Sequence, residues 1–110
     1  MITWIYGQSG AGKTTLAKKM AAESSKTIIL DGDDMRKVWS IGFSKEDRWE
    51  NNLRIARLAA TLESQGFEVI VATICPYREL RKEIGSLIHC RFIYLSGGKP
   101  TTSEYPFEID

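Results

Sequence analysis

The sequence is poor in the residues that build disulfide frameworks and metal centres. Its 110 residues include two cysteines and one histidine. Cys75 and Cys90 lie in apolar segments without the Cys-x-x-Cys spacing of many metal sites, so neither a disulfide framework nor a zinc site is encoded. We predict that both cysteines are reduced thiols, and that His89 and the three tryptophans are structural.

An excess of charge of one sign is also lacking. The 15 Lys and Arg residues nearly balance 14 Asp and Glu residues, so no broad basic face is expected for a nucleic-acid backbone or an anionic membrane. No apolar run approaches the ~20 residues of a membrane span, and the opening run 2–6 is too short for a signal peptide. We therefore expect a cytoplasmic protein without nucleic-acid or membrane partners, in which any anion site is a local pocket.

Short apolar runs rich in β-formers alternate with longer amphipathic segments. This alternation predicts an α/β fold, with a parallel sheet of about four strands and helices on both faces. Ser44 is the expected N-cap of a long helix that closes at Gly66. Strands are expected over 2–6, 27–30, 67–74 and 91–95, and helices over 14–23, 35–38, 45–65 and 79–84.

The length allows one core, so we expect residues 1–110 to form a single domain. Residues 96–110 contain Gly97, Gly98, Pro100 and Pro106 without periodicity, which predicts an irregular tail. A sheet this small has exposed edges, which favour pairing with a second copy as a homodimer.

The segment from Gly7 to Thr14 matches the phosphate-binding pattern G-x-x-x-x-G-K-[ST], and it lies between a predicted strand and a predicted helix. Glycines let backbone N–H groups close around phosphate oxygens, while the helix N-terminus and Lys13 supply positive charge. Thr14 is the expected magnesium ligand. A glycine-rich turn without function is the much weaker alternative. The motif predicts ATP and Mg²⁺ as cofactors, held by Gly7, Ser9, Gly10, Ala11, Gly12, Lys13, Thr14 and Thr15.

Asp31 and Asp33 follow the end of a predicted strand, where ligands bind in open parallel sheets. One carboxylate could contact hydrated magnesium and the other an acceptor hydroxyl, which are two roles that a kinase needs. The alternative is a solvated acidic turn, in which Asp34 suits the N-cap of the next short helix best.

Several polar side chains are expected at the same edge and could bind an anionic acceptor together with Lys13. These residues are Arg36, Arg48, Asn51 and Arg78. Other arginines are expected on the solvated surface, namely Arg54, Arg57 and Arg81. Phe43 is either a packing residue or an aromatic platform for a nucleobase.

Four segments together resemble adenylylsulfate kinase (APS kinase), in order and in spacing, over most of residues 1–84. They are YGQSGAGKTTLAK, LDGDDMR, GFSKEDRWENNLR and GFEVIVATICPYRELR. That family transfers the γ-phosphoryl group of MgATP to the ribose 3′-hydroxyl of adenosine 5′-phosphosulfate. The resemblance implies the same P-loop kinase activity here, with 3′-phosphoadenosine 5′-phosphosulfate as product.

The resemblance also implies roles for individual residues. Asp33 would be the catalytic base and Asp31 the carboxylate on the magnesium side, with Lys13 as the third catalytic residue. Arg36, Arg48 and Asn51 would hold the phosphosulfate, while Phe43 would stack on its adenine. The family's Ser-Pro-Tyr-Arg segment reads Cys75, Pro76, Tyr77 and Arg78 here, and implies substrate contacts at these positions.

The sequence departs from the family after the strand at 91–95. The family has a lid rich in Lys and Arg there, whereas this chain passes directly to SGGKPTTSEYPFEID. The later Glu104-Tyr105-Pro106 resembles the region that follows the lid, so we interpret the difference as a lid deletion. Without a lid, water competes for the phosphoryl group, which predicts a slow kinase or one completed by a partner. A P-loop kinase for another small hydroxyl-bearing substrate and a nucleotide-binding module without kinase activity remain the alternatives.

Overall fold

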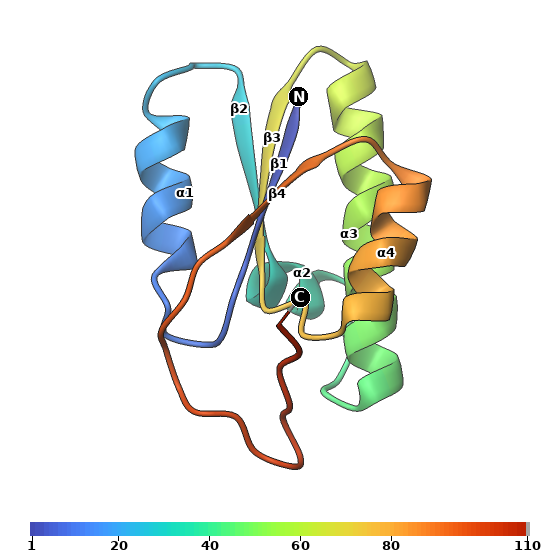
Figure 1. The fold of residues 1–110 in the computed structure, drawn as a ribbon. Coiled ribbons are helices and arrows are strands. Elements are labelled where there is room, and N and C mark those ends of the chain that lie inside the picture. The colour runs from blue at the N-terminus through green and yellow to red at the C-terminus, as the bar shows by residue number, and fades with distance from the viewer. Residues whose placement is uncertain (110) are drawn as a thin grey trace.

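A four-stranded parallel sheet forms the centre of the computed structural model, which describes residues 1–109 (Figure 1). Its strands are β1 (Ile2–Tyr6), β2 (Thr27–Asp31), β3 (Glu68–Thr73) and β4 (Arg91–Tyr94). Their order is β2-β3-β1-β4, so β1 and β3 are the central pair. Both are buried almost throughout, which explains their continuous apolar sequences. The predicted α/β class and parallel sheet are confirmed.

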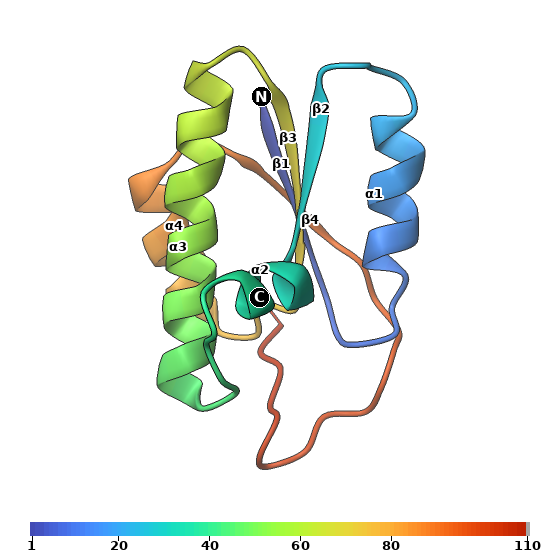
Figure 2. The same ribbon diagram turned by 180° about the vertical axis from the view of Figure 1, so that it is seen from behind.

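Helices cover both faces of the sheet, as predicted (Figures 1 and 2). They are α1 (Lys13–Ala21), α2 (Gly32–Val38), α3 (Lys45–Ser64) and α4 (Arg78–Leu87). The α1 helix packs on one face over a small apolar cluster around Ile5 and Ala17. The α3 and α4 helices cover the other face over a larger cluster that includes Trp4, Ile55 and Leu80. The short α2 helix lies at the carboxyl edge of the sheet.

Within the described residues, side chains cap the N-termini of two helices, α2 and α3. Ser44 caps α3 by accepting a hydrogen bond from the Asp47 backbone N–H at 3.0 Å, as expected. Asp34, which suited the N-cap of the next helix in the alternative of a solvated acidic turn, does not cap it. That helix begins at Gly32, three residues earlier than expected, and its N-cap is Asp31, whose Oδ1 accepts from the backbone N–H groups of Asp33 and Asp34. The cap therefore fixes the Asp31 carboxylate at the end of β2.

Arg81 was expected on the surface, and that expectation was wrong. Its side chain is 5% exposed and lies 4.6 Å from the ring centre of Tyr6. Its guanidinium donates hydrogen bonds to the backbone oxygens of Cys75 at 2.8 Å and Glu108 at 2.6 Å. Arg81 lies three residues before the buried Ile84, on the apolar stripe of α4. Burial is tolerated there because carbonyl groups and an aromatic face replace water.

After Leu95 the chain forms the predicted irregular tail, which crosses the carboxyl edge of the sheet and returns toward α4 (Figure 1). The Lys99 backbone N–H donates to the Ser9 carbonyl at 2.8 Å. At the far end, the Phe107 ring stacks on Tyr6, with ring centres 6.3 Å apart. The tail is therefore attached at the phosphate-binding loop and again near the sheet.

Both cysteines are free thiols, as predicted. Burial raises the pKa of Cys75 to about 12 and that of Cys90 to about 11. Within residues 1–109, no helix is long and apolar enough to cross a membrane.

Candidate active site

The loop between β1 and α1 has the backbone geometry of a phosphate cradle. Gly10 and Gly12 adopt positive φ angles of 83° and 96°, which residues other than glycine rarely adopt. A Cβ at Gly7 would collide with the carbonyl oxygen of Leu95, so only glycine fits at this position, where the chain leaves β1 beside β4. The glycines of the motif thus meet a steric requirement at three positions.

The first turn of α1 leaves its amide groups available to an anion. Its N-cap is Gly12, and within the described chain no side chain caps this helix and no acidic residue lies in its first turn. Lys13 directs its Nζ to the Gln8 carbonyl at 2.9 Å. Burial lowers the pKa of Lys13, and the nearby Asp31 and Asp33 carboxylates oppose that shift. The hydrogen bond to Gln8 thus holds the Nζ of Lys13 against the loop.

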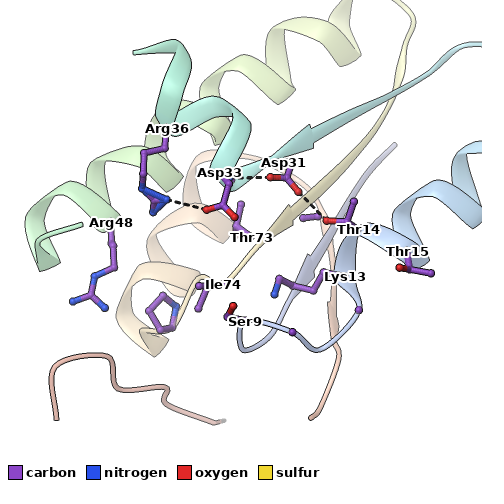
Figure 3. Close-up of a pocket in the computed structure, with 15 residues that line it drawn as sticks. Ser9, Lys13, Thr14, Thr15, Asp31, Asp33, Arg36, Arg48, Thr73 and Ile74 are labelled. Atoms are coloured by element: carbon purple, nitrogen blue, oxygen red, sulfur yellow. Dashed lines mark hydrogen bonds and ion pairs between the residues drawn. The ribbon is translucent and has the colours of Figure 1, made fainter. Parts of the chain in front are cut away.

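Two acidic residues lie across the cavity from this loop, Asp31 at the end of β2 and Asp33 in the first turn of α2 (Figure 3). The Asp31 carboxylate accepts a hydrogen bond from the Thr14 hydroxyl at 2.9 Å, so the two expected magnesium ligands are adjacent. Asp33 extends from α2, is 82% exposed, and lies 3.5 Å from the guanidinium of Arg36. Among residues 1–109, no cluster of three or more His, Cys, Asp or Glu could hold a metal alone. Mg²⁺ commonly binds one or two protein oxygens together with phosphates and water, so this donor pair fits it.

These groups line a cavity of about 330 Å³, which we call the donor cavity (Figure 3). Thr73, the last residue of β3, and Ile74, which follows it, also line this cavity and were not predicted from the sequence. Because β3 lies between β1 and β2, its end had to reach the same edge, and strand order would have identified them. The predicted residues in its wall are Ser9, Gly10, Gly12, Lys13, Thr14, Thr15, Asp31, Asp33, Arg36, Arg48 and Pro76.

A larger cavity of about 970 Å³ adjoins the first, and we call it the acceptor cavity. The two share a wall that includes Asp33, Arg36 and Arg48. Phe43 lies on the outer side of the acceptor cavity, 59% exposed, with its ring centre 4.3 Å from the Arg36 guanidinium carbon. Four cationic side chains and one carboxylate line this cavity, which favours an anionic occupant. They are Arg36, Lys37, Arg48, Lys99 and Asp33.

Asn51 is placed differently from the other expected acceptor residues. It is 1% exposed, accepts a hydrogen bond from the Trp39 indole at 2.8 Å and donates to the Gly32 carbonyl at 3.3 Å. These contacts join the first half of α3 to both ends of α2. Asn51 therefore fixes the helix that carries Asp33 and Arg36.

The segment from Cys75 to Arg78 turns away from the cavities after Pro76. The Cys75 side chain is fully buried in the larger core cluster, and its backbone has a positive φ of 44°. Tyr77 is buried against Trp49, with ring centres 5.5 Å apart. The Arg78 backbone N–H donates to the Glu108 carboxylate at 2.9 Å, so the tail supplies an N-terminal contact to α4. The contact of Glu108 was not predictable from the sequence, because only the tertiary fold brings this residue to α4.

The parallel sheet, the phosphate cradle and the paired carboxylates at the carboxyl edge define a P-loop α/β protein of the kinase type. The family model for adenylylsulphate kinase matches residues 1–97. The chain belongs to this family, which confirms the resemblance seen in the sequence.

Individual relatives agree with this assignment. The adenylyl-sulfate kinase of Picosynechococcus sp. is 47% identical over 87 residues, covering 74% of this chain and 49% of that protein. The hexameric APS kinase from Thiobacillus denitrificans superposes with a TM-score of 0.78 at 31% identity, covering 99% of this chain and 23% of that one. The Mycobacterium tuberculosis APS kinase CysC in complex with AMPPNP and APS gives 0.69 at 31% identity, covering 84% and 59%. The chain spans about half the length of the curated relatives it matches.

Proposed function

We propose that this chain phosphorylates the 3′-hydroxyl of adenosine 5′-phosphosulfate with MgATP. The observation that carries the proposal is that Asp33 lies in the wall shared by the two cavities, between a phosphate cradle and a cationic chamber. A carboxylate in this position can reach an acceptor hydroxyl while the donor phosphates lie on the other side. The relative whose structure is in complex with AMPPNP and APS supports this pair of ligands.

On the donor side, the backbone amides between Gly10 and Thr14 bind phosphate oxygens, and Lys13 contributes a point charge. Thr14 and Asp31 are the residues that would hold Mg²⁺, which neutralises phosphate charge when bound. Gly7, Ser9, Ala11 and Thr15 complete the proposed nucleotide site.

On the acceptor side, Asp33 accepts the proton of the attacking hydroxyl, and Arg36 and Arg48 bind the anionic group. Phe43 stacks on the adenine from the open side of the cavity. Asn51 and the segment from Cys75 to Arg78 support this site mainly by fixing α2, α4 and the position of Pro76.

We treat residues 1–109 as one catalytic unit, because the two core clusters lie on opposite faces of a single sheet and the tail packs across its edge. The tail replaces a basic lid with a short irregular segment. Water therefore reaches the transferring phosphoryl group more easily, and turnover is expected to be slow, with some ATP hydrolysed without transfer.

Turnover of MgATP, measured with and without adenosine 5′-phosphosulfate, tests the function. ADP and the 3′-phosphorylated product are followed separately in one reaction. Product formed in step with ADP supports the kinase. ADP without product would mean a leaky ATPase with another acceptor, and ATP binding without either product would identify a binding module.

A further inference from the structure

Residues 98–109 lie beyond the family match, yet they close one side of the acceptor cavity. We call these residues the strap. Lys99, Pro100, Thr102, Tyr105 and Pro106 of the strap line the acceptor cavity. The strap is attached at both ends, by Lys99 at the phosphate-binding loop and by the ring of Phe107 and the backbone of Glu108 near the sheet. It is therefore a built wall of the cavity.

The strap also contacts Arg48, one of the two arginines in the wall shared by the cavities. The Arg48 guanidinium carbon lies 5.2 Å from the ring centre of Tyr105 and 5.5 Å from that of Tyr77. Its Nη2 donates to the Glu104 carbonyl at 3.4 Å, and its Nε donates to the Ser44 carbonyl at 3.4 Å. Two rings and two carbonyl groups thus restrain a side chain that is otherwise flexible.

Tyr105 is itself held in place. Its backbone N–H donates to the Thr102 hydroxyl at 3.0 Å, and its carbonyl accepts from the Thr102 N–H at 3.2 Å. This turn presents the ring to Arg48, while 46% of Tyr105 stays exposed. A side chain so exposed can be replaced without damage to the core.

We propose that Tyr105 is a positioning residue, which holds the Arg48 guanidinium ready for the anionic group of the acceptor. The inference rests on the proposed function. A guanidinium that is already stacked on an aromatic ring loses less conformational entropy when it binds an anion. The ring carries no charge, so it does not neutralise the guanidinium. The aromatic face matters for this role, and the phenolic hydroxyl does not.

The kinetic test compares Tyr105→Leu with Tyr105→Phe. We expect Tyr105→Leu to raise the KM for adenosine 5′-phosphosulfate by roughly threefold to tenfold, with kcat and the KM for MgATP unchanged. Tyr105→Phe should restore the wild-type KM. Thr101→Ala, at an exposed strap position outside the cavity walls, is the matched control and should have no effect. An unchanged KM in Tyr105→Leu would overturn the proposal.

A double-mutant cycle tests whether Tyr105 acts through Arg48. In an Arg48→Ala background, the further change Tyr105→Leu should leave the dissociation constant for adenosine 5′-phosphosulfate unaltered. A loss of the same size in both backgrounds would mean that Tyr105 contacts the ligand or shapes the cavity without Arg48, and would overturn the positioning role.

A measurement on the free protein separates this inference from the proposed function. The Nε–H resonance of Arg48 in a nitrogen–proton NMR spectrum should move when Tyr105→Leu removes one of its two neighbouring rings, and should return with Tyr105→Phe. If the wild type neither binds nor phosphorylates adenosine 5′-phosphosulfate, the proposed function fails, while this resonance still reports on the contact. An Arg48 resonance unaffected by Tyr105→Leu would overturn the inference whatever the acceptor is.

Discussion

The donor and acceptor cavities share a wall but are built in different ways. The donor cavity depends on a backbone conformation within eight consecutive residues, from Gly7 to Thr14, with one pair of carboxylates opposite. The acceptor cavity is lined by residues 8, 9 and 74, by residues between 33 and 48, and by the strap, which are far apart in sequence. Damage at the donor cavity should therefore affect binding of MgATP, whereas damage at the acceptor cavity should affect binding of the acceptor substrate.

The largest expected effect falls on the shared wall. Asp33→Asn keeps the size of the side chain but removes its ability to take a proton, so kcat should fall by about 10²- to 10⁴-fold with MgATP binding retained. Asp34→Asn is the matched control, because Asp34 is exposed on the same helix and outside both cavity walls. Steady-state kinetics and calorimetric binding of MgATP measure the two effects. Loss of MgATP binding in Asp33→Asn would place Asp33 on the donor side alone.

A change confined to the donor cavity should be smaller and should act on binding. Lys13→Ala removes charge-assisted hydrogen bonds to phosphate, so MgATP affinity should fall by about 10- to 100-fold. Affinity for the acceptor, measured without nucleotide, should change little. Equal losses for both ligands would contradict the division into two cavities.

The contact between the strap and the phosphate-binding loop can be broken on its own. Gly98 has a φ of 82°, and a Cβ there would collide with the carbonyl oxygen of Ser9. Gly98→Ala should destabilise the attached strap by about 1–3 kcal/mol and speed hydrogen exchange at the Lys99 amide. Gly97→Ala is the control, because its φ of 100° carries similar strain but its Cβ would meet open space. Similar exchange at Lys99 in both variants would show that the collision has no effect.

The smallest effect is a pH dependence of the donor cavity. Burial lowers the pKa of Lys13 below its usual 10.5, and a bound phosphate favours the protonated form. MgATP affinity should therefore be constant below that lowered pKa and fall as pH rises through it, by at most about tenfold per pH unit. Calorimetry across the alkaline range measures this fall. The guanidinium of Lys13→Arg stays charged and should remove the fall, whereas an identical profile in that variant would assign it to another group.

The same contrast explains which features could be predicted from the sequence. The cradle was predictable because its glycines and Lys13 lie within eight consecutive residues of the chain. The Ser44 cap of α3 was also predictable, since a cap is a local signal. Asn51 was expected at the substrate but joins α2 to α3. A sequence pattern does not distinguish an asparagine that binds a ligand from one that links two helices. Arg81 was misplaced because its charge suggested solvent, although its spacing from Ile84 matches the buried stripe of α4. The contact between Glu108 and α4 spans thirty residues and has no local signal.

Asp31 holds two parts of the molecule with the two oxygens of one carboxylate. Oδ1 caps the first turn of α2, and Oδ2 accepts the hydrogen bond of Thr14 on the other side of the cavity. Selection for the fold of α2 and selection for the ion binding proposed above would therefore act on the same side chain. An engineer who alters one will disturb the other, except with Asp31→Asn, whose amide oxygen can still cap the helix without the charge. Most single substitutions of Asp31 should therefore change the cap of α2 and the hydrogen bond to Thr14 together.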